Sequence, residues 1–208
     1  PSRTALMGIA FKSVNGLHRD SIVLEVLAKL LSNGPNSPFE GIKKQSIVHD
    51  VMPSWERMRD PYIFNVYVTT NSATESAMKN AEDNVIKILQ SDFEILDSTF
   101  ELAKKTIKYS WEEAMSSTRG MASEVNEAIA RGNPYDVFDR FDVLKSVTLK
   151  DIRRVCRETF VLNKSTVGWY MPQKEQPLEK DLTLQYVSKE YPSAPAINRL
   201  PKFNASKL

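Results

Sequence analysis

Residues 5–31 read ALMGIAFKSVNGLHRDSIVLEVLAKLL, and the spacing of their apolar residues changes once along the stretch. In the first part every second residue is apolar, which is the period of a β-strand with one buried face. From residue 20 onward the apolar residues recur every three or four positions, which is typical of a buried amphipathic helix. The stretch therefore predicts a strand over residues 4–12, with Ala5, Met7, Ile9 and Phe11 on one face, and then a helix that begins at Asp20 or Ser21.

The next segment, NGPNSPF at residues 33–39, contains turn-forming residues and predicts the end of that helix at Gly34-Pro35. Two further strands are indicated by SIVHDVM at 46–52 and YIFNVYVTT at 62–70, joined by a long loop with a proline at each end. An antiparallel hairpin is the simplest interpretation, with Phe64, Val66 and Val68 on one face and Ile63 and Tyr67 on the other.

Helical spacing dominates the following hundred or so residues. Ser72 with Glu75, and Ser98 with Glu101, have the spacing of capping boxes and predict the starts of two long helices, the first over 73–90. A third helix is expected from about 118 to 131, closed by Gly132. A short helix, DVFDRFDVLKS, should follow with Phe138, Phe141 and Leu144 facing inward.

Thr148 and Asp151 then predict the start of the helix LKDIRRVCRETF, and residues 164–171 predict a final strand. The order of elements predicts an α+β fold: a mostly antiparallel sheet of about four or more strands, with several helices packed on one face. We expect this domain to span residues 1–173. Residues 174–208 are polar and rich in proline, which indicates an extended arm or inter-domain linker.

Composition excludes several classes of protein. The formal net charge is +2, too small to favour a nucleic-acid or anionic-membrane partner, and no apolar run approaches the roughly 20 residues of a membrane-spanning helix. The single cysteine, Cys156, has no internal disulfide partner and falls within a helical pattern, so we expect a buried structural thiol. Because the sequence does not begin with Met, we interpret it as a piece of a longer chain. The composition does not indicate a cellular compartment.

The sequence offers no complete catalytic site. The only two histidines, His18 and His49, lack neighbours at the spacing of zinc ligands. Glycine is too sparse for a phosphate-binding loop, and no G-x-S-x-G motif is present. The tripeptide HRD at 18–20 lacks the other motifs of a protein kinase. If the chain belongs to an enzyme, it is therefore expected to be a part that does not carry the reactive groups.

Three stretches together resemble the insulinase/pitrilysin family of zinc metallopeptidases, which includes mitochondrial processing peptidase. LMGIAFKSVNGLHRDSIVLEVLAKLLSNGPNSPF is similar to the family's opening strand and helix, and RDPYIFNVYVTT to its hairpin strand. SVTLKDIRRVCRETFVLNKSTVGWYMPQ resembles its closing helix and strand. The three stretches lie between residues 6 and 173, in the family's order.

In that family, homologous α+β domains form a clamshell around a closed chamber, and the catalytic domain carries the zinc motif His-x-x-Glu-His. This sequence has no such motif, so the resemblance implies a non-catalytic domain with no catalytic or metal-binding residue and no cofactor of its own. Zinc would lie in the catalytic domain of the parent protein, on the same chain or on a partner subunit. Peptides that fit the chamber would be the substrates. We expect this sequence to be the second domain of a longer chain with several domains.

Some members of the family contribute an Arg and a Tyr from a non-catalytic domain to hold the substrate. Lys43 and His49 fall near those places in this sequence, although both identities differ and the interval is about two residues short. They are the candidate substrate-binding residues, and we expect no direct role in catalysis because Lys lacks the bidentate fork of Arg. Two other functions stay open: a purely architectural subunit without peptidase activity, and a stand-alone peptide-binding domain.

Overall fold

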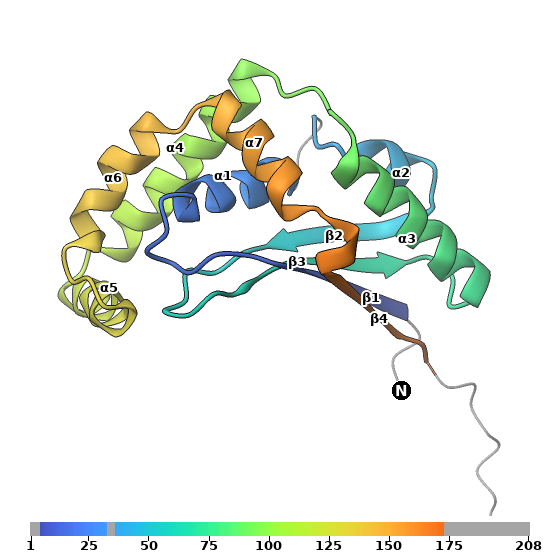
Figure 1. Ribbon diagram of the computed structural model, residues 1–208, viewed down its shortest axis with the longest axis horizontal. Coiled ribbons are helices and arrows are strands. Elements are labelled where there is room, and N and C mark those ends of the chain that lie inside the picture. The colour runs from blue at the N-terminus through green and yellow to red at the C-terminus, as the bar shows by residue number, and fades with distance from the viewer. Residues whose placement is uncertain (1–4, 33–35, 173–208) are drawn as a thin grey trace, which may run out of the picture. The chain divides into compact units, whose positions relative to one another are not determined.

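The computed structural model describes residues 5–32 and 36–172, and these form an α+β domain (Figure 1). Its strands are β1 (Ala5–Lys12), β2 (Val48–Ser54), β3 (Ile63–Thr70) and β4 (Ser165–Tyr170). The helices are α1 (Ser21–Leu31), α2 (Glu40–Lys44), α3 (Glu75–Gln90), α4 (Asp97–Ala114), α5 (Thr118–Arg131), α6 (Asp136–Ser146) and α7 (Leu149–Thr159), with a short 3₁₀ turn, η1 (Leu162–Lys164), before β4. The expected 174–208 arm lies outside the described residues.

All pairings in the four-stranded sheet are antiparallel, and the strand order is β2-β3-β1-β4. The first strand therefore lies inside the sheet and the last strand forms one edge beside it. The expected hairpin is confirmed as β2 and β3, with one irregularity, because the register shifts between Val48 and Asp50 at the intervening His49. The predicted strand positions and the antiparallel sheet are confirmed.

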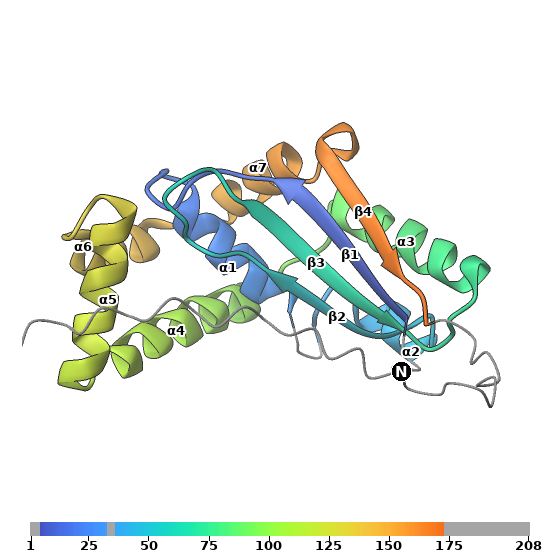
Figure 2. The same ribbon diagram turned by 90° about the horizontal axis from the view of Figure 1, so that it is seen from below.

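The helices cover one face of this sheet, as Figure 1 shows. Figure 2 is the view from below and looks directly onto the strands of the other face. Alternate residues of β1 and β3 enter the core beneath the helices, and they are the residues predicted to share a face of each strand. The largest helix contribution to the core comes from α1. Eight of the eleven residues of α1 are buried, because it lies between the sheet and the outer helices. Among the described residues, none of the helices is long and apolar enough to cross a membrane.

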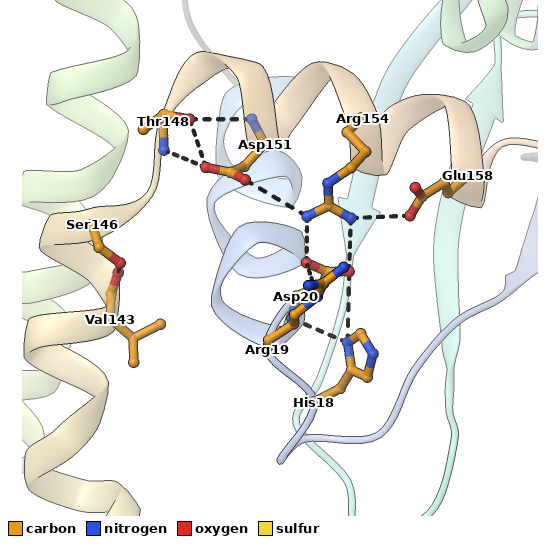
Figure 3. Close-up of polar contacts among 9 residues, drawn as sticks. All are labelled: His18, Arg19, Asp20, Val143, Ser146, Thr148, Asp151, Arg154 and Glu158. Atoms are coloured by element: carbon orange, nitrogen blue, oxygen red, sulfur yellow. Dashed lines mark hydrogen bonds and ion pairs between the residues drawn. The ribbon is translucent and has the colours of Figure 1, made fainter.

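The tripeptide His18-Arg19-Asp20 has a structural place at the start of α1 (Figure 3). Asp20 is buried, and its carboxylate accepts two hydrogen bonds from Arg154 of α7. The backbone N–H of Asp20 donates to Nδ1 of His18 at 3.1 Å. Asp20 was expected to cap α1, but its side chain makes no capping hydrogen bond and joins α1 to α7 instead.

Several local predictions were wrong. α3 begins after Thr74, whose side chain accepts from the N–H of Ala77, and not after Ser72. α4 begins after Leu96 with no side-chain cap, so Ser98 lies inside the helix. Phe138 is 59% exposed, although it was expected to face inward. The short helix α2 was not predicted. The helix α1 ends at Leu31, and the helix end expected at Gly34-Pro35 lies outside the described residues.

Other local predictions are confirmed. Thr148 and Asp151 form a complete capping box at the start of α7, in which each side chain accepts the other residue's backbone N–H. α5 spans Thr118–Arg131 and ends at Gly132, which adopts the left-handed conformation with φ of 103°. Glycine is favoured there because other residues pay a steric cost at positive φ.

Candidate functional site

The candidate site is the face of the sheet that no described element covers, which we call the open face (Figure 2). One row of paired residues crosses all four strands at its centre, because Met52 pairs with Tyr67, Tyr67 with Gly8, and Gly8 with Gly168. Successive side chains of a strand point to opposite faces, so these four positions lie opposite the buried residues of the core. Met52 and Tyr67 are more than 40% exposed.

The two glycines make the β1–β4 half of this row shallow. A Cβ atom on Gly8 would come within 3.7 Å of the Tyr67 ring, so that ring lies beside the Gly8 backbone. A Cβ atom on Gly168 would meet nothing within 4 Å. Glycine in a strand allows another backbone to approach closely, and this arrangement leaves space over β4, at one end of the row.

The next row of the open face combines polar and apolar groups. Asp50 pairs with Thr69, Thr69 with Leu6, and Leu6 with Tyr170, which is 56% exposed. Tyrosine offers a large apolar ring and a hydroxyl that can form hydrogen bonds, so Tyr67 and Tyr170 give the face two groups suited to contact with a peptide. β2 and β4, the outer strands of the described sheet, bound this surface.

Lys43 and His49, the candidates from the sequence, lie at the β2 edge of the open face and not at its centre. Lys43 in α2 donates a hydrogen bond of 2.6 Å to Asp50, and this contact, together with the N–H of Val51, holds the pKa of Asp50 below its ordinary value. His49 is the exposed residue at the register shift of β2. Whether either side chain contacts a substrate stays a prediction.

The described part of the chain contains no group of three or more His, Cys, Asp or Glu residues that could hold a metal ion. His18 lies in the turn before α1 and His49 lies in β2, and neither contributes to such a group. Cys156 in α7 is partly buried, and burial raises the pKa of its thiol to about 12. Such a thiol stays protonated near neutral pH and is a poor nucleophile, which agrees with a structural role.

The sequence did not indicate the central row of the open face. Tyr67 was placed on the face opposite Phe64, Val66 and Val68, but the pairing of Gly8 with Gly168 joins positions at the two ends of the domain. Short strands do not reveal their register without the partner strand. The sequence did contain one indication of this row, because each of the two predicted strands has a glycine, Gly8 and Gly168.

Comparison with known proteins identifies the family. A family model described as the peptidase M16 inactive domain matches residues 1–106. A search of curated proteins found no match. The fold is similar to the inactive peptidase domain of a candidate zinc protease from Bordetella parapertussis, with a TM-score of 0.77 and 17% identity over 86% of this chain and 97% of that one.

Two other solved structures show the same fold in larger chains. A protease from Helicobacter pylori matches with a TM-score of 0.69 and 19% identity, over 82% of this chain and 42% of that one. Complex III2 from Candida albicans contains a chain that matches with a TM-score of 0.68 and 12% identity, over 81% of this chain and 43% of that one. This domain thus spans less than half of those two chains.

The family match agrees with the resemblance to non-catalytic insulinase/pitrilysin domains and with the absence of a zinc-binding motif from the sequence. It covers just over half of the chain and includes α1 and three of the four strands of the open face, β1, β2 and β3. The chain belongs to the peptidase M16 family, as an inactive domain.

Proposed function

We propose that this chain is the substrate-enclosing domain of a zinc-dependent endopeptidase, with the zinc in a catalytic domain on the same parent chain or on a partner subunit. The open face carries the proposal: it is a sheet surface with exposed Met52, Tyr67 and Tyr170, and no described element covers it. Exposed apolar groups gathered on one face commonly mark a surface that contacts a ligand or another protein.

An extended peptide fits the chemistry of this face better than a folded protein does. The space beside Gly168 admits a backbone, while the rings of Tyr67 and Tyr170 can contact apolar side chains and form hydrogen bonds with peptide groups. In a clamshell chamber this face would form part of the wall. The peptide would be held against it while the catalytic domain cleaves it, and large folded proteins would not enter.

The comparisons support this proposal at the level of the fold. The Bordetella parapertussis domain comes from a candidate zinc protease and the Helicobacter pylori chain is a protease, which favours a peptidase as the parent protein. The similarity to a chain of complex III2 favours a second function, a purely architectural subunit of a larger assembly. The parent's zinc content separates the two, since an architectural subunit is expected to bind no stoichiometric zinc.

The test uses two glycines with equal space around them. In the full-length parent protein, Gly168→Phe adds a ring to the open face, whereas Gly41→Phe adds the same ring to α2; neither Cβ would meet an atom within 4 Å. We expect Gly168→Phe to lower kcat/KM for an internally quenched peptide about tenfold, mainly through KM, because lost uniform binding raises KM. Gly41→Phe should change it less than about twofold.

Zinc content and thermal unfolding are measured on both variants, so that damage to the fold or to the metal site is recognised. Equal kcat/KM for the two variants, with folding and zinc intact, would show that the open face does not contact substrate. A parent protein that holds no zinc and cleaves no peptide would instead support the architectural function.

A further inference from the structure

A second surface feature lies away from the open face: a pocket of about 640 Å³ that opens between the β2–β3 loop and the helices α1, α4, α5 and α6. Figure 1 shows α5 and α6 together beyond one end of the sheet. We call this feature the arginine pocket, because Arg57, Arg131 and Arg140 line it together with Trp55 and Trp111. None of these residues belongs to the rows of the open face described above.

The three arginine side chains are almost fully buried, with exposed fractions of 10% for Arg57, 8% for Arg131 and 4% for Arg140. Each is held in place by a carboxylate. Arg57 and Arg131 share Asp136, at 2.5 Å and 3.2 Å, and Arg140 contacts Glu124 at 2.8 Å. These ion pairs fix the guanidinium groups before any ligand arrives, which reduces the entropy lost on binding.

The same ion pairs leave many donors without an acceptor. In the part of the chain that the structure describes, six buried nitrogen atoms of the pocket wall have no hydrogen-bond partner: Nε and Nη1 of Arg57, Nε of Arg131, Nε and Nη2 of Arg140, and Nε1 of Trp55. On the acceptor side, one buried oxygen of the wall, Oε2 of Glu25, is similarly unpaired. Buried unpaired donors are costly, so the wall is suited to a ligand rich in acceptors.

The charges around the pocket restrict which acceptor fits. Burial raises the pKa of Glu25, and this rise is partly opposed by the nearby Arg57. Glu56 and Glu127 also line the pocket but are exposed. Their negative charges oppose a multiply charged anion such as phosphate. A single carboxylate carries one charge and presents two oxygens that match the planar fork of a guanidinium group.

We propose that the arginine pocket binds a carboxylate group, contributed by the C-terminus of a peptide or by a small carboxylic acid. The carboxylate accepts hydrogen bonds from the guanidinium groups and from the indole N–H of Trp55. The ring of Trp111, which lies 4.5 Å from the guanidinium carbon of Arg140, forms an apolar side of the pocket for the rest of the ligand.

The test observes Trp55 directly. The chain has three tryptophans, so its ¹H–¹⁵N spectrum contains three indole signals, and a Trp55→Phe variant assigns the signal of Trp55. The 208-residue chain is titrated at pH 7 with sodium acetate to roughly 50 mM, which covers millimolar dissociation constants, against sodium chloride at equal ionic strength. We expect a saturable shift of the Trp55 signal with acetate and none with chloride.

Two more titrations identify the source of the carboxylate. Trialanine with a free C-terminus should shift the same signal, whereas trialanine amide should not, which would place a peptide C-terminus in the pocket. A response to acetate without one to trialanine would support a small carboxylic acid. The proposal is overturned if acetate causes no saturable shift, if chloride causes the same shift, or if inorganic phosphate binds more tightly than acetate.

Arg140→Lys tests the fork, because it keeps the charge and removes the paired donors. We expect it to weaken acetate binding about tenfold. The matched control is Arg153→Lys in α7, a residue that pairs with Asp92 and does not line the pocket, and it should leave the affinity unchanged. The indole signal of Trp169, which donates to Glu82, reports an intact fold in both variants. Equal affinity in the two variants would contradict the role given to the arginine.

Discussion

Arg154 in α7 donates two hydrogen bonds to the carboxylate of Asp20 at the start of α1, from Nη1 to Oδ2 at 3.0 Å and from Nη2 to Oδ1 at 2.5 Å (Figure 3). The two residues are 134 positions apart. Arg154 also contacts Asp151 and Glu158 on its own helix, which positions the guanidinium group. No catalytic role was assigned to the HRD tripeptide from the sequence. Its Asp20 instead joins α1 to α7, the first and last α-helices described.

Asp20→Asn should lower the free energy of unfolding by about 2 kcal/mol at pH 7. The neutral amide cannot accept both hydrogen bonds that the Arg154 guanidinium donates to the carboxylate, and Asp20 is buried. The Arg154 contact lowers the folded-state pKa of Asp20. The stabilisation is therefore present above the unfolded pKa of about 3.9 and lost as pH falls through the folded pKa. Urea unfolding at several pH values measures it.

The difference between wild type and Asp20→Asn should narrow as pH falls from about 4 through the lowered folded-state pKa of Asp20. Asp142→Asn is the control, because Asp142 forms an exposed surface pair with Lys145 and should change stability by less than about 0.5 kcal/mol. A destabilisation by Asp20→Asn that stays constant across this range would show that the ionised carboxylate is not what stabilises the contact.

Helix caps provide a second prediction. Thr148→Ala should cost about 1 kcal/mol, because the Thr148 side chain accepts the N–H of Asp151 and α7 loses that cap. Ser98→Ala replaces a residue that the sequence suggested as a cap but that lies inside α4, so it should change stability by less than about 0.5 kcal/mol. Chemical denaturation compares the two variants. Equal losses would mean that α4 begins where the sequence predicted.

The sequence predicted the elements well and their ends poorly. Strands and long helices followed from the period of apolar residues, because burial on one face imposes that period. A cap depends on which of several nearby Ser and Thr residues adopts an extended backbone, and near α3 that residue is Thr74, not Ser72. The spacing of Ser72 and Glu75 was compatible with a capping box but did not establish one.

One residue of the predicted inward face of α6 was wrong, whereas Leu144 is buried and Phe141 packs against the core, as predicted. The sequence suggested that Phe138 is buried, whereas Arg140 is buried instead. Burial of an arginine requires partners, and these come from other helices: Glu124 of α5 and the ring of Trp111 of α4. Only the tertiary arrangement brings them together. The open face also depended on pairing that no local pattern contains, that of Gly8 with Gly168.

Substitutions in α6 test this corrected orientation. Phe138→Ala should change the free energy of unfolding by less than about 0.5 kcal/mol, since the ring is 59% exposed. Leu144→Ala should cost about 2 to 4 kcal/mol, because Leu144 is 3% exposed and its loss leaves a cavity. Thermal and urea unfolding both measure the difference. A loss of several kcal/mol for Phe138→Ala would restore the orientation predicted from the sequence.

The sequence candidates Lys43 and His49 give the final prediction, measured in the full-length parent protein. Lys43→Ala and His49→Phe should each lower peptide turnover by less than about tenfold. Lys43 already forms an ion pair with Asp50, and His49 is exposed at the edge of the open face, so we expect neither to act directly on the scissile bond. Steady-state kinetics with an internally quenched peptide test both variants. A loss of about a hundredfold, with zinc content and unfolding temperature unchanged, would instead give this edge of the domain a direct part in catalysis.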